Sequence, residues 1–336
     1  MTLSVSIIVC SKDRPGDLAV AIASIRRCDE VGRNAELIVV EECAMARQIP
    51  DVRYIHLQPQ GRGFGHARNT GLKAARGDIV LFIDDDCQAA PGWASKLLRP
   101  LLSDPSVLGV AGAVLVKDCG LIGYAENILG FPGGGLRYVH DAQQRTVPTQ
   151  HLSTCNCAYR RAAVELIGWF PEETRWGGED ALVAERISAL GPCLFAPEAQ
   201  VYHRTRDDLG KVFSWFVRRG RSDVATIRCR RDRRAYLWSL FRSSLTLKSA
   251  PVTALLAAVP NPISLLTVGM LFYYGFLLWR FRFAWRYRPH RNALWLVPIV
   301  KLVMDLGADT GRVTAWLGKG STDPNRSTMA EAATRP

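Results

Sequence analysis

The sequence predicts an α/β fold built on an open, doubly wound and mainly parallel sheet, followed by a helical region at the C-terminus. Two observations support this prediction. Over residues 1–210, short and nearly pure apolar runs alternate with segments whose apolar residues recur at helical spacing. Such continuous runs are typical of parallel strands that are covered on both faces. Beyond residue 210 this alternation is replaced by long basic and apolar segments.

The expected elements form a βαβ series, which is the sequence signature of a doubly wound sheet. We expect strands at residues 5–9, 36–40, 52–57, 79–83, 107–116 and 200–203, and helices at residues 17–27, 67–75, 93–102 and 181–190. Residues 131–150 are rich in glycine and polar residues and are expected to form a long irregular loop. A loop of that length in a compact domain is usually functional.

The composition allows a full core and argues against a disulfide scaffold. The chain has 336 residues, of which 48% are hydrophobic, so one large domain or two smaller ones are expected. Its nine cysteines are scattered and contain no CxxC pair. A chain of this size and spacing is not expected to carry structural disulfides or a structural zinc site, and the cysteines fit buried apolar positions in a reducing compartment.

The formal net charge of +12 is concentrated in two segments. Residues 204–242 contain twelve Lys or Arg against four Asp or Glu, and residues 280–291 contain five Arg and no acid. This concentration indicates an anionic partner, either a phospholipid surface or nucleic acid. Arginines alternate with aromatic residues over 279–288, which is typical of a lipid headgroup layer. No nucleic-acid partner is expected, because it would leave the neighbouring apolar run unexplained.

That apolar run, residues 249–279, has no charged residue and is longer than a membrane-spanning helix requires. It is interrupted by Pro260-Asn261-Pro262. A hairpin that enters the membrane and returns, a single kinked span, and a buried core or dimer helix all remain open, although basic residues on both flanks favour the hairpin. The chain begins on a strand-like run without a signal peptide, so we expect it at the cytoplasmic face of the cell membrane.

These features divide the chain into four predicted regions. They are a catalytic domain at 1–210, a basic amphipathic helical segment at 211–248, membrane-associated helices at 249–318 that include an amphipathic segment at 293–316, and a flexible tail at 319–336.

Three adjacent carboxylates, Asp84, Asp85 and Asp86, directly follow the apolar run at 79–83. They are expected at the carboxyl end of a parallel strand, where ligands bind in open α/β sheets. Their mutual repulsion would be relieved by a divalent cation that also binds substrate phosphates. In an extended chain Asp84 and Asp86 point to the same side and Asp85 to the other. The alternative is a solvated acidic turn.

A second acidic pair, Glu179-Asp180, follows Trp176-Gly177-Gly178. Acidic residues in the first turn of a helix are often only caps. The glycines and the tryptophan before this pair also suit the close approach of a ligand. A carboxylate at this position could remove a proton from an acceptor hydroxyl.

Five collinear segments between residues 4 and 205 together resemble family 2 glycosyltransferases, whose fold is called GT-A. The segments are Val5 to Val9 with Arg14-Pro15, Ala67-Arg68-Asn69-Thr70-Gly71 continuing through Gly77-Asp78 to Asp84-Asp85-Asp86-Cys87, Asn156-Cys157-Ala158-Tyr159-Arg160-Arg161, Gly177-Gly178-Glu179-Asp180 with Arg186, and Pro197 to His203.

The resemblance implies a role for each matching residue. It implies donor contacts by Ser11, Arg14, Glu41, Glu42, Arg68, Asp84 and Asp85, metal ligation by Asp86 and His203, acceptor contacts by Asn156, Trp176 and Gly178, and catalysis by Asp180 as general base with Glu179 supporting the acceptor. The implied cofactor is Mn²⁺ or Mg²⁺. A histidine at the end of a strand can also be purely structural.

The implied reaction is the inverting transfer of one sugar from a nucleotide-sugar donor to a hydroxyl or phosphate. A lipid-linked, glycolipid or polysaccharide acceptor is expected, because a membrane segment follows the catalytic domain. Glu41-Glu42-Cys43 stands where the family commonly has DD-G-S, and the processive motif Q-x-x-R-W is missing from the sequence. Single-sugar transfer is therefore favoured over polymerisation. A nucleotidyl or phosphoryl transferase using the same metal site and a non-catalytic membrane scaffold remain as alternatives.

Overall fold

The computed structural model describes residues 4–174, 176–247, 249 and 262–318. The predicted tail at 319–336 and the predicted break at Pro260-Asn261 lie outside these residues. A mixed sheet forms the centre of the described structure, with strand order β3-β2-β1-β4-β8-β6-β9-β5 and β7 paired with β9. Its strands are β1 (Val5–Lys12), β2 (Glu36–Glu42), β3 (Arg53–Leu57), β4 (Ile79–Ile83), β5 (Cys87–Ala89), β6 (Gly109–Leu115), β7 (Val147–Pro148), β8 (Asn156–Arg160) and β9 (Cys193–His203).

The parallel half of the sheet consists of β3, β2, β1 and β4, and β6 also pairs with β9 in parallel. The strand β8 runs antiparallel between β4 and β6, and β5 pairs antiparallel with β9. The doubly wound, mainly parallel sheet expected from the sequence is therefore confirmed, with antiparallel strands added on one side.

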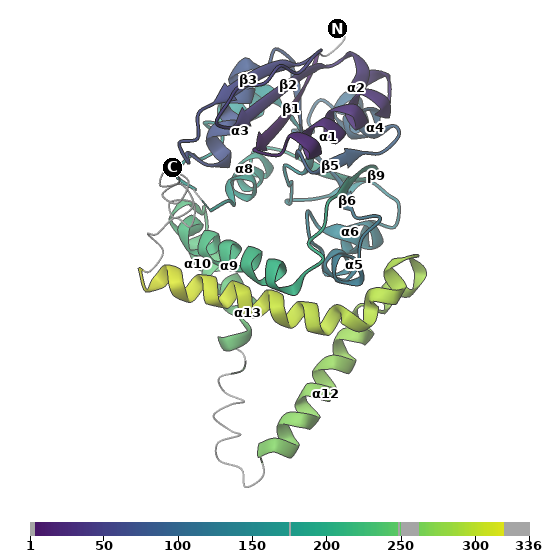
Figure 1. Cartoon of the computed structure of the whole chain (residues 1–336), viewed down its shortest axis with the longest axis vertical. Helices are drawn as coiled ribbons and strands as arrows, with labels where there is room; N and C mark the ends of the chain where they lie inside the picture. Colours follow the sequence, from purple (N-terminus) through teal and green to yellow (C-terminus); the bar gives the residue numbers. More distant parts are fainter. Residues whose placement is uncertain (1–3, 175, 248, 250–261, 319–336) are drawn as a thin grey trace, which may run out of the picture.

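Helices cover both faces of the sheet (Figure 1). Side chains of α1 and α4 form one core with alternate residues of the strands, and side chains of α3, α7 and α8 form a second core on the opposite face. The helices are α1 (Pro15–Cys28), α2 (Glu30–Asn34), α3 (Phe64–Ala74), α4 (Trp93–Ser103), α5 (Leu121–Ile128), α6 (Gly135–Ala142), α7 (Arg161–Leu166), α8 (Glu179–Ser188), α9 (Leu209–Thr226), α10 (Arg233–Ser243), α12 (Pro262–Arg280) and α13 (Val297–Trp316), with 3₁₀ turns at Ile227–Cys229, Arg282–Arg286 and His290–Leu296.

The predicted irregular loop at 131–150 is wrong, because this segment contains α6 and β7. Gly133, Gly134 and Gly135 all have positive φ angles, and they form the turn that leads into α6 rather than a long loop. Leu136 and Ala142 of the helix are buried. A glycine run that starts a helix is easily read as a loop. The strand predicted at 200–203 is also longer than expected, since β9 begins at Cys193.

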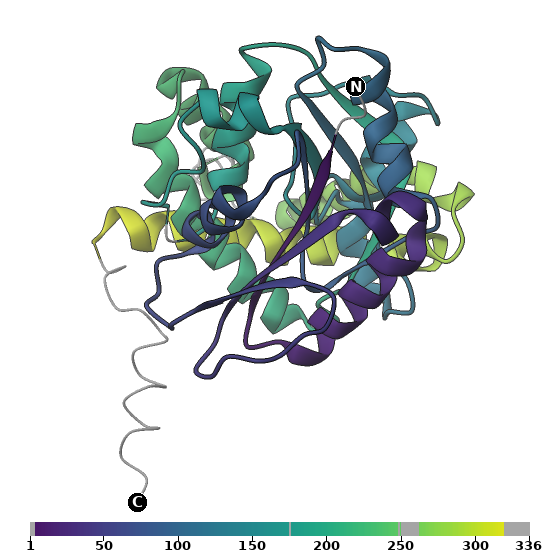
Figure 2. The same ribbon diagram turned by 90° about the horizontal axis from the view of Figure 1, so that it is seen from above.

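The C-terminal helices α9 and α13 pack closely together through glycines. A Cβ atom at Gly220 of α9 would lie 2.0 Å from the carbonyl oxygen of Ala308, and one at Gly311 of α13 would lie 2.0 Å from that of Val217. Figure 2 shows α13 crossing beneath the sheet domain. Both helices share a third core with α5 and the turn at His290–Leu296, so they are joined to the sheet domain by apolar packing.

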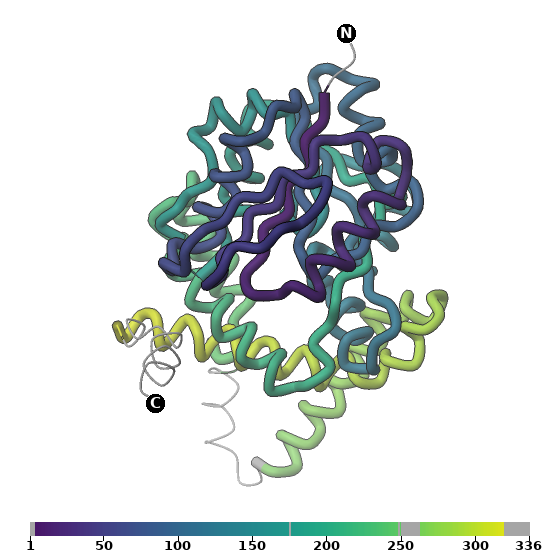
Figure 3. Tube along the Cα trace, turned by 45° about the horizontal axis from the view of Figure 1, so that its top comes forward, coloured from purple at the N-terminus to yellow at the C-terminus, as the bar shows by residue number. Residues whose placement is uncertain are grey.

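The helix α12 projects away from the rest of the described structure (Figures 1 and 3). Its apolar side chains are largely uncovered, with Ile263 and Phe272 each 75% exposed. Among the described residues, one helical stretch, Ile263–Arg280, is long and apolar enough to cross a bilayer, and only 6% of it is buried against the protein.

Candidate active site

The acidic triplet lies where three strands meet. Asp84 directly follows β4, and His203 is the last residue of β9. Pairing of β5 with β9 places Cys87 opposite His203, and the backbone N–H of Arg204 donates to the carbonyl oxygen of Asp86 at 2.9 Å. The sheet topology therefore brings a histidine from the far end of the domain next to the triplet.

The three aspartates lie in a turn after β4, which the Cys87 N–H closes by donating to the Asp84 carbonyl oxygen at 3.1 Å, and not in the extended chain that the sequence predicts. Asp85 turns toward β1, where its Oδ2 accepts a hydrogen bond from Ser11 Oγ at 2.8 Å and its Oδ1 lies 3.3 Å from Arg14 Nη1. Burial and the charge of Asp86 raise the pKa of Asp85 from 3.8 to about 6, and Ser11 and Arg14 oppose this shift. Asp84 contacts Cys155 and Arg68, whereas Asp86 lies between His203 and Arg14.

Asp86 and His203 form a candidate site for a hard divalent cation. Asp86 Oδ1 lies 3.2 Å from His203 Nε2, and Asp86 Oδ2 pairs with Arg14 Nη1 at 2.8 Å. The other ring nitrogen of His203, Nδ1, hydrogen-bonds the carbonyl oxygen of Arg204, so Nε2 is the nitrogen that faces the carboxylates. One imidazole and carboxylate oxygens at the end of a sheet suit Mn²⁺ or Mg²⁺ with substrate phosphates as further ligands.

A buried arginine connects the triplet to the second acidic motif. Arg68 on α3 forms an ion pair with Glu179 Oε1 and lies 3.8 Å from Asp84 Oδ1. Burial raises the pKa of Glu179, and the positive charge of Arg68 acts against this rise. Glu179 Oε2 is also buried and has no hydrogen-bond partner among the described residues. A buried carboxylate oxygen of this kind is suited to accept a hydrogen bond from a bound hydroxyl.

Asp180 is the less constrained of the two neighbouring acids. Its Oδ1 accepts a hydrogen bond from the backbone N–H of Ala181 at 2.8 Å, and within the described part of the chain it forms no ion pair. The preceding Gly178 has a φ angle of +91°, and a Cβ atom there would lie 2.6 Å from Ser222 Oγ of α9. Ser222 Oγ in turn donates to the Gly177 carbonyl oxygen at 2.5 Å. The helix α9 thus fixes the turn that presents both acids.

The donor residues predicted at the end of β2 lie beside β1, with Glu41 opposite Ser11. Glu41 is buried, and its Oε2 accepts a hydrogen bond from Tyr54 Oη at 2.9 Å and forms an ion pair with Arg47 Nε at 3.1 Å. Its Oε1 is without a hydrogen-bond partner among the described residues. Glu42 pairs with Lys12 Nζ at 3.0 Å.

The predicted acceptor contact of Asn156 does not fit the structure. Asn156 is buried, its Oδ1 accepts from Trp93 Nε1 at 2.8 Å, and its Nδ2 donates to the carbonyl oxygens of Ala113 and Ala199 at 2.9 and 2.8 Å. Both amide hydrogens are therefore used inside the sheet, and Asn156 is a structural residue. Trp176, another predicted acceptor residue, lies under the guanidinium of Arg221 of α9 at 5.3 Å.

Sequence reasoning missed two groups that the structure brings to the site. Cys155 Sγ donates to Asp84 Oδ2 at 2.9 Å, and in the sequence it is only one of nine scattered cysteines. Arg206 pairs with the buried Glu126 at 3.2 Å and lies 4.4 Å over the ring of Trp215. Arg206 lies in the basic stretch at 204–242, which the sequence assigns as a whole to an anionic partner.

Another arginine of this basic stretch, Arg218 of α9, is open to solvent but faces other cations. Partial desolvation and the positive charges of Arg206 and Arg14 lower the pKa of Arg218. It has no ion pair in the described part of the chain. Arg14, Arg206 and Arg218 therefore concentrate positive charge beside the acidic site, as a phosphate-bearing ligand requires.

The sheet, its covering helices and the acidic site at its strand ends define a GT-A fold. A mannosyltransferase from Pyrobaculum calidifontis, PcManGT, solved in complex with GDP-Man and Mn²⁺, superimposes on 95% of this chain and 88% of its own with a TM-score of 0.63 and 18% sequence identity. Residues 6–168 match the model of the glycosyl transferase family 2. Residues 6–168 are therefore a family 2 glycosyltransferase domain by this match, which confirms the resemblance seen in the sequence.

Curated relatives match about half of the chain. The pre-mycofactocin glycosyltransferase of Mycobacterium tuberculosis is 31% identical over 179 residues, which cover 50% of this chain and 35% of that protein. The O-antigen chain rhamnosyltransferase RfbN of Salmonella typhimurium is 26% identical over 166 residues, which cover 48% of this chain and 53% of that protein. The chain thus spans about a third to a half of the length of these two relatives.

Proposed function

We propose that the chain is an inverting, metal-dependent glycosyltransferase that moves one sugar from a nucleotide-sugar donor to a hydroxyl or phosphate of a lipid-linked, glycolipid or polysaccharide acceptor at the cytoplasmic face of a membrane. The arrangement of Asp86 with His203 on one side, and Asp180 on the other, is the observation that supports it best. Arg68 and Glu179 lie between them and hold the two sides together. Donor binding and proton removal are thereby assigned to different carboxylates.

The residues divide the reaction among them. Asp86 and His203 Nε2 would hold Mn²⁺ or Mg²⁺, which supplies charge neutralisation for a diphosphate leaving group when bound. Asp180 accepts the proton of the acceptor hydroxyl as its oxygen attacks the anomeric carbon. The bond from that carbon to the diphosphate breaks in the same displacement, so the configuration inverts. Glu179 Oε2 accepts a hydrogen bond from the acceptor, which fits its unpartnered state among the described residues.

Charge around the site supports phosphate-bearing substrates. Arg14 approaches Asp85 and Asp86 from β1, and Arg206 and Arg218 approach from the segment that leads into and along α9. Guanidinium groups near a cation site favour phosphate recognition. Both a donor diphosphate and a phosphorylated lipid acceptor would benefit from them.

The membrane part of the proposal is supported by α12. Its exposed apolar surface projects from the molecule, and the following segment carries Arg280, Arg282, Arg286 and Arg288. An apolar helix next to basic residues suits insertion into a bilayer with an anionic surface. The relatives named for O-antigen chain synthesis and for succinoglycan biosynthesis are consistent with an acceptor that is assembled into a polysaccharide.

A ligand screen followed by product analysis tests the function. We expect the full chain, purified in detergent, to be stabilised against thermal unfolding by at least one nucleoside diphosphate with Mn²⁺, and not by that nucleotide with EDTA. The corresponding nucleotide sugar should then yield the nucleoside diphosphate as product. Release of pyrophosphate would instead indicate a nucleotidyl transferase. Failure of every common nucleoside diphosphate to shift the midpoint would contradict the proposal.

A further inference from the structure

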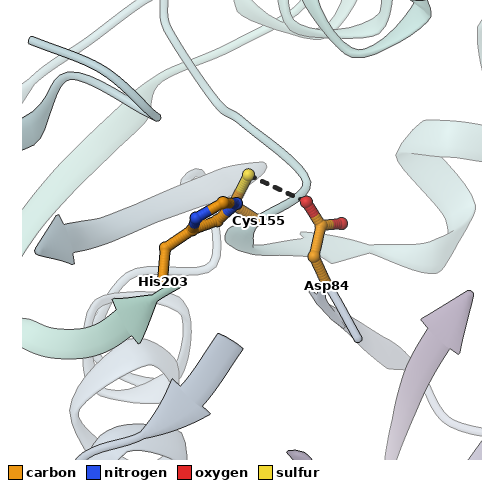
Figure 4. A group of neighbouring side chains, drawn as sticks. All are labelled: Asp84, Cys155 and His203. Carbon is orange, nitrogen blue, oxygen red and sulfur yellow. Dashed lines mark hydrogen bonds between the residues drawn. The ribbon is translucent and has the colours of Figure 1, made fainter. Parts of the chain in front are cut away.

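A cysteine, a histidine and an aspartate from three separate segments converge at the acidic site (Figure 4). Asp84 follows β4, Cys155 precedes β8, and His203 ends β9. Cys155 Sγ lies 2.9 Å from Asp84 Oδ2, and one ligand atom from each of the three residues lies within 4.8 Å of the other two. All three side chains are partly exposed, so an ion could reach them.

We propose that Asp84, Cys155 and His203 form a binding site for a thiophilic divalent cation of the Zn²⁺ type, which overlaps the Mn²⁺ or Mg²⁺ site and competes with it. One sulfur, one imidazole nitrogen and one carboxylate oxygen are a donor set that Zn²⁺ accepts with a fourth position left open. Thiolate is a poor ligand for Mg²⁺ and Mn²⁺ and a good one for Zn²⁺. Cys155 is therefore the ligand that distinguishes the two kinds of cation.

The two cation sites share one ligand atom and therefore exclude each other. His203 Nδ1 is engaged by the carbonyl oxygen of Arg204, which leaves Nε2 for either the Asp86 set or the Asp84–Cys155 set. A tetrahedral zinc ion separates its ligand atoms by about 3.3 to 3.8 Å, given metal–ligand bonds of about 2.0 to 2.3 Å. The three atoms need only small side-chain movements to reach this geometry. The thiol proton leaves to solvent as the metal–sulfur bond forms.

A second thiol in reach is Cys87, because Asp86, Cys87 and His203 also offer ligand atoms within 4.8 Å of one another. Cys87 is fully buried and packs in the core formed with α1 and α4. Cys155 is partly exposed and already contacts a carboxylate. Recruiting Cys87 would require displacing core side chains, so Cys155 is the ligand and Cys87 provides a matched control.

Binding of Co²⁺ tests the site without any assay of transfer. The full chain in detergent, reduced and freed of added thiols, is titrated with Co²⁺ while thiolate-to-Co²⁺ charge-transfer absorption is recorded. We expect the band in the parent protein and in Cys87→Ser, its loss in Cys155→Ser, and its bleaching by one equivalent of Zn²⁺. Excess Mn²⁺ should shift the Co²⁺ titration to higher concentrations. Circular dichroism checks that each variant is folded.

The result that overturns the site is a folded parent protein without the band, or a band that survives in Cys155→Ser and is lost in Cys87→Ser. The competition between Mn²⁺ and the thiophilic cation rests on the proposed function, and the titration tests it separately from the existence of the soft-metal site. A charge-transfer band that Mn²⁺ does not affect would keep the soft-metal site and contradict competition. Sugar transfer with Mn²⁺ by a protein that shows no band would keep the proposed function and contradict the soft-metal site.

Discussion

Glu179 and Asp180 are adjacent in the sequence but differ in what surrounds their carboxylates. Glu179 is buried against Arg68, and removing one partner of such a pair leaves an uncompensated charge, which typically costs about 3 to 5 kcal/mol. Asp180 is half-buried and carries no ion pair in the described structure. The first carboxylate is therefore needed for the architecture of the site, and the second is available for proton transfer.

The substitution Asp180→Asn should reduce kcat by a factor of about 10² to 10⁴, because general-base catalysis contributes about that much. The affinity for the nucleotide should stay unchanged, since the donor residues lie elsewhere, and the melting midpoint should change little. Steady-state kinetics with isothermal titration of the nucleoside diphosphate check both. Asp141→Asn, a change at an exposed acid of α6, serves as the control and should keep full activity. An Asp180→Asn enzyme with undiminished kcat would require another base.

The raised pKa of Asp85 makes the stability of the metal-free protein depend on pH. Its pKa of about 6 in the folded protein lies above the ordinary 3.8, so folding favours the neutral carboxyl. The resulting contribution to the free energy of unfolding is fully present below pH 4 and is lost as pH rises through 6. A shift of about two units corresponds to at most about 3 kcal/mol. Asp85→Asn should therefore raise the thermal midpoint at pH 8 in EDTA, and change it little at pH 4.

Thermal unfolding of both proteins across this pH range measures the effect. Saturating Mn²⁺ should stabilise the parent protein more at pH 8 than at pH 5, because the cation offsets the repulsion among the ionised carboxylates. Equal midpoints of parent and Asp85→Asn at pH 8 would show that Ser11 and Arg14 already compensate the charge.

At the residue scale the sequence predicts what depends on local order. The position of Asp84, Asp85 and Asp86 directly after a buried strand follows from local order, but the alternation expected for an extended chain is not found, because the backbone turns at Asp85 and Asp86. The environment of Asn156 could not be predicted, because its partners Trp93 and Ala199 come from segments about 60 and 40 residues away. Cys155 was missed for the same reason, since only the register of β4 with β8 brings it to Asp84.

At the scale of elements, the close contact between α9 and α13 determines how the C-terminal region is attached. Small residues at the crossing let the two backbones approach, and Ser222 of α9 then contacts the glycine turn that precedes Glu179 and Asp180. The contact therefore links the C-terminal helices to the placement of Glu179 and Asp180.

The substitution Gly311→Ala should loosen this crossing, because the new Cβ would lie 2.0 Å from the Val217 carbonyl oxygen and the helices would have to separate. We expect a loss of about 1 to 3 kcal/mol in the free energy of unfolding, as for other overpacked interiors, together with reduced kcat. Gly269→Ala on α12 is the matched control, since a Cβ there meets nothing within 4 Å, and it should leave the midpoint unchanged or slightly higher. Equal midpoints in the two variants would mean that the crossing is adaptable.

Element prediction succeeded where an apolar run is buried on both sides and failed where glycines open a helix. The expected strand at 79–83 coincides with β4, because all five of its side chains are buried. The helix α6 was missed because Gly134 is its N-cap and Gly135 its first residue, a composition that normally indicates a loop.

On the scale of the whole molecule, three cores connect the two faces of the sheet and the C-terminal helices. Two lie on the faces of the sheet, and the third joins α5 of the catalytic part to α9 and α13. Removing the C-terminal region would therefore expose part of a core, so truncation would not test the proposed membrane binding separately from folding. Substitutions on the projecting surface of α12 leave all three cores intact.

The substitution Phe272→Glu should release the protein from membranes without unfolding it. Phe272 is 75% exposed on α12, and losing the burial of one such side chain in lipid costs about 2 kcal/mol, which is about a 30-fold drop in partitioning. Flotation with vesicles of phosphatidylcholine and phosphatidylglycerol measures it, and Met45→Glu, at an 80% exposed residue far from α12 in the sequence, is the control. Vesicles without phosphatidylglycerol should bind the parent protein less, because the arginines at 280–291 then lose their anionic partners. If both variants float like the parent protein, α12 does not insert, and its apolar surface would instead be covered by another copy of the chain, which the oligomeric state of the detergent-free protein would reveal.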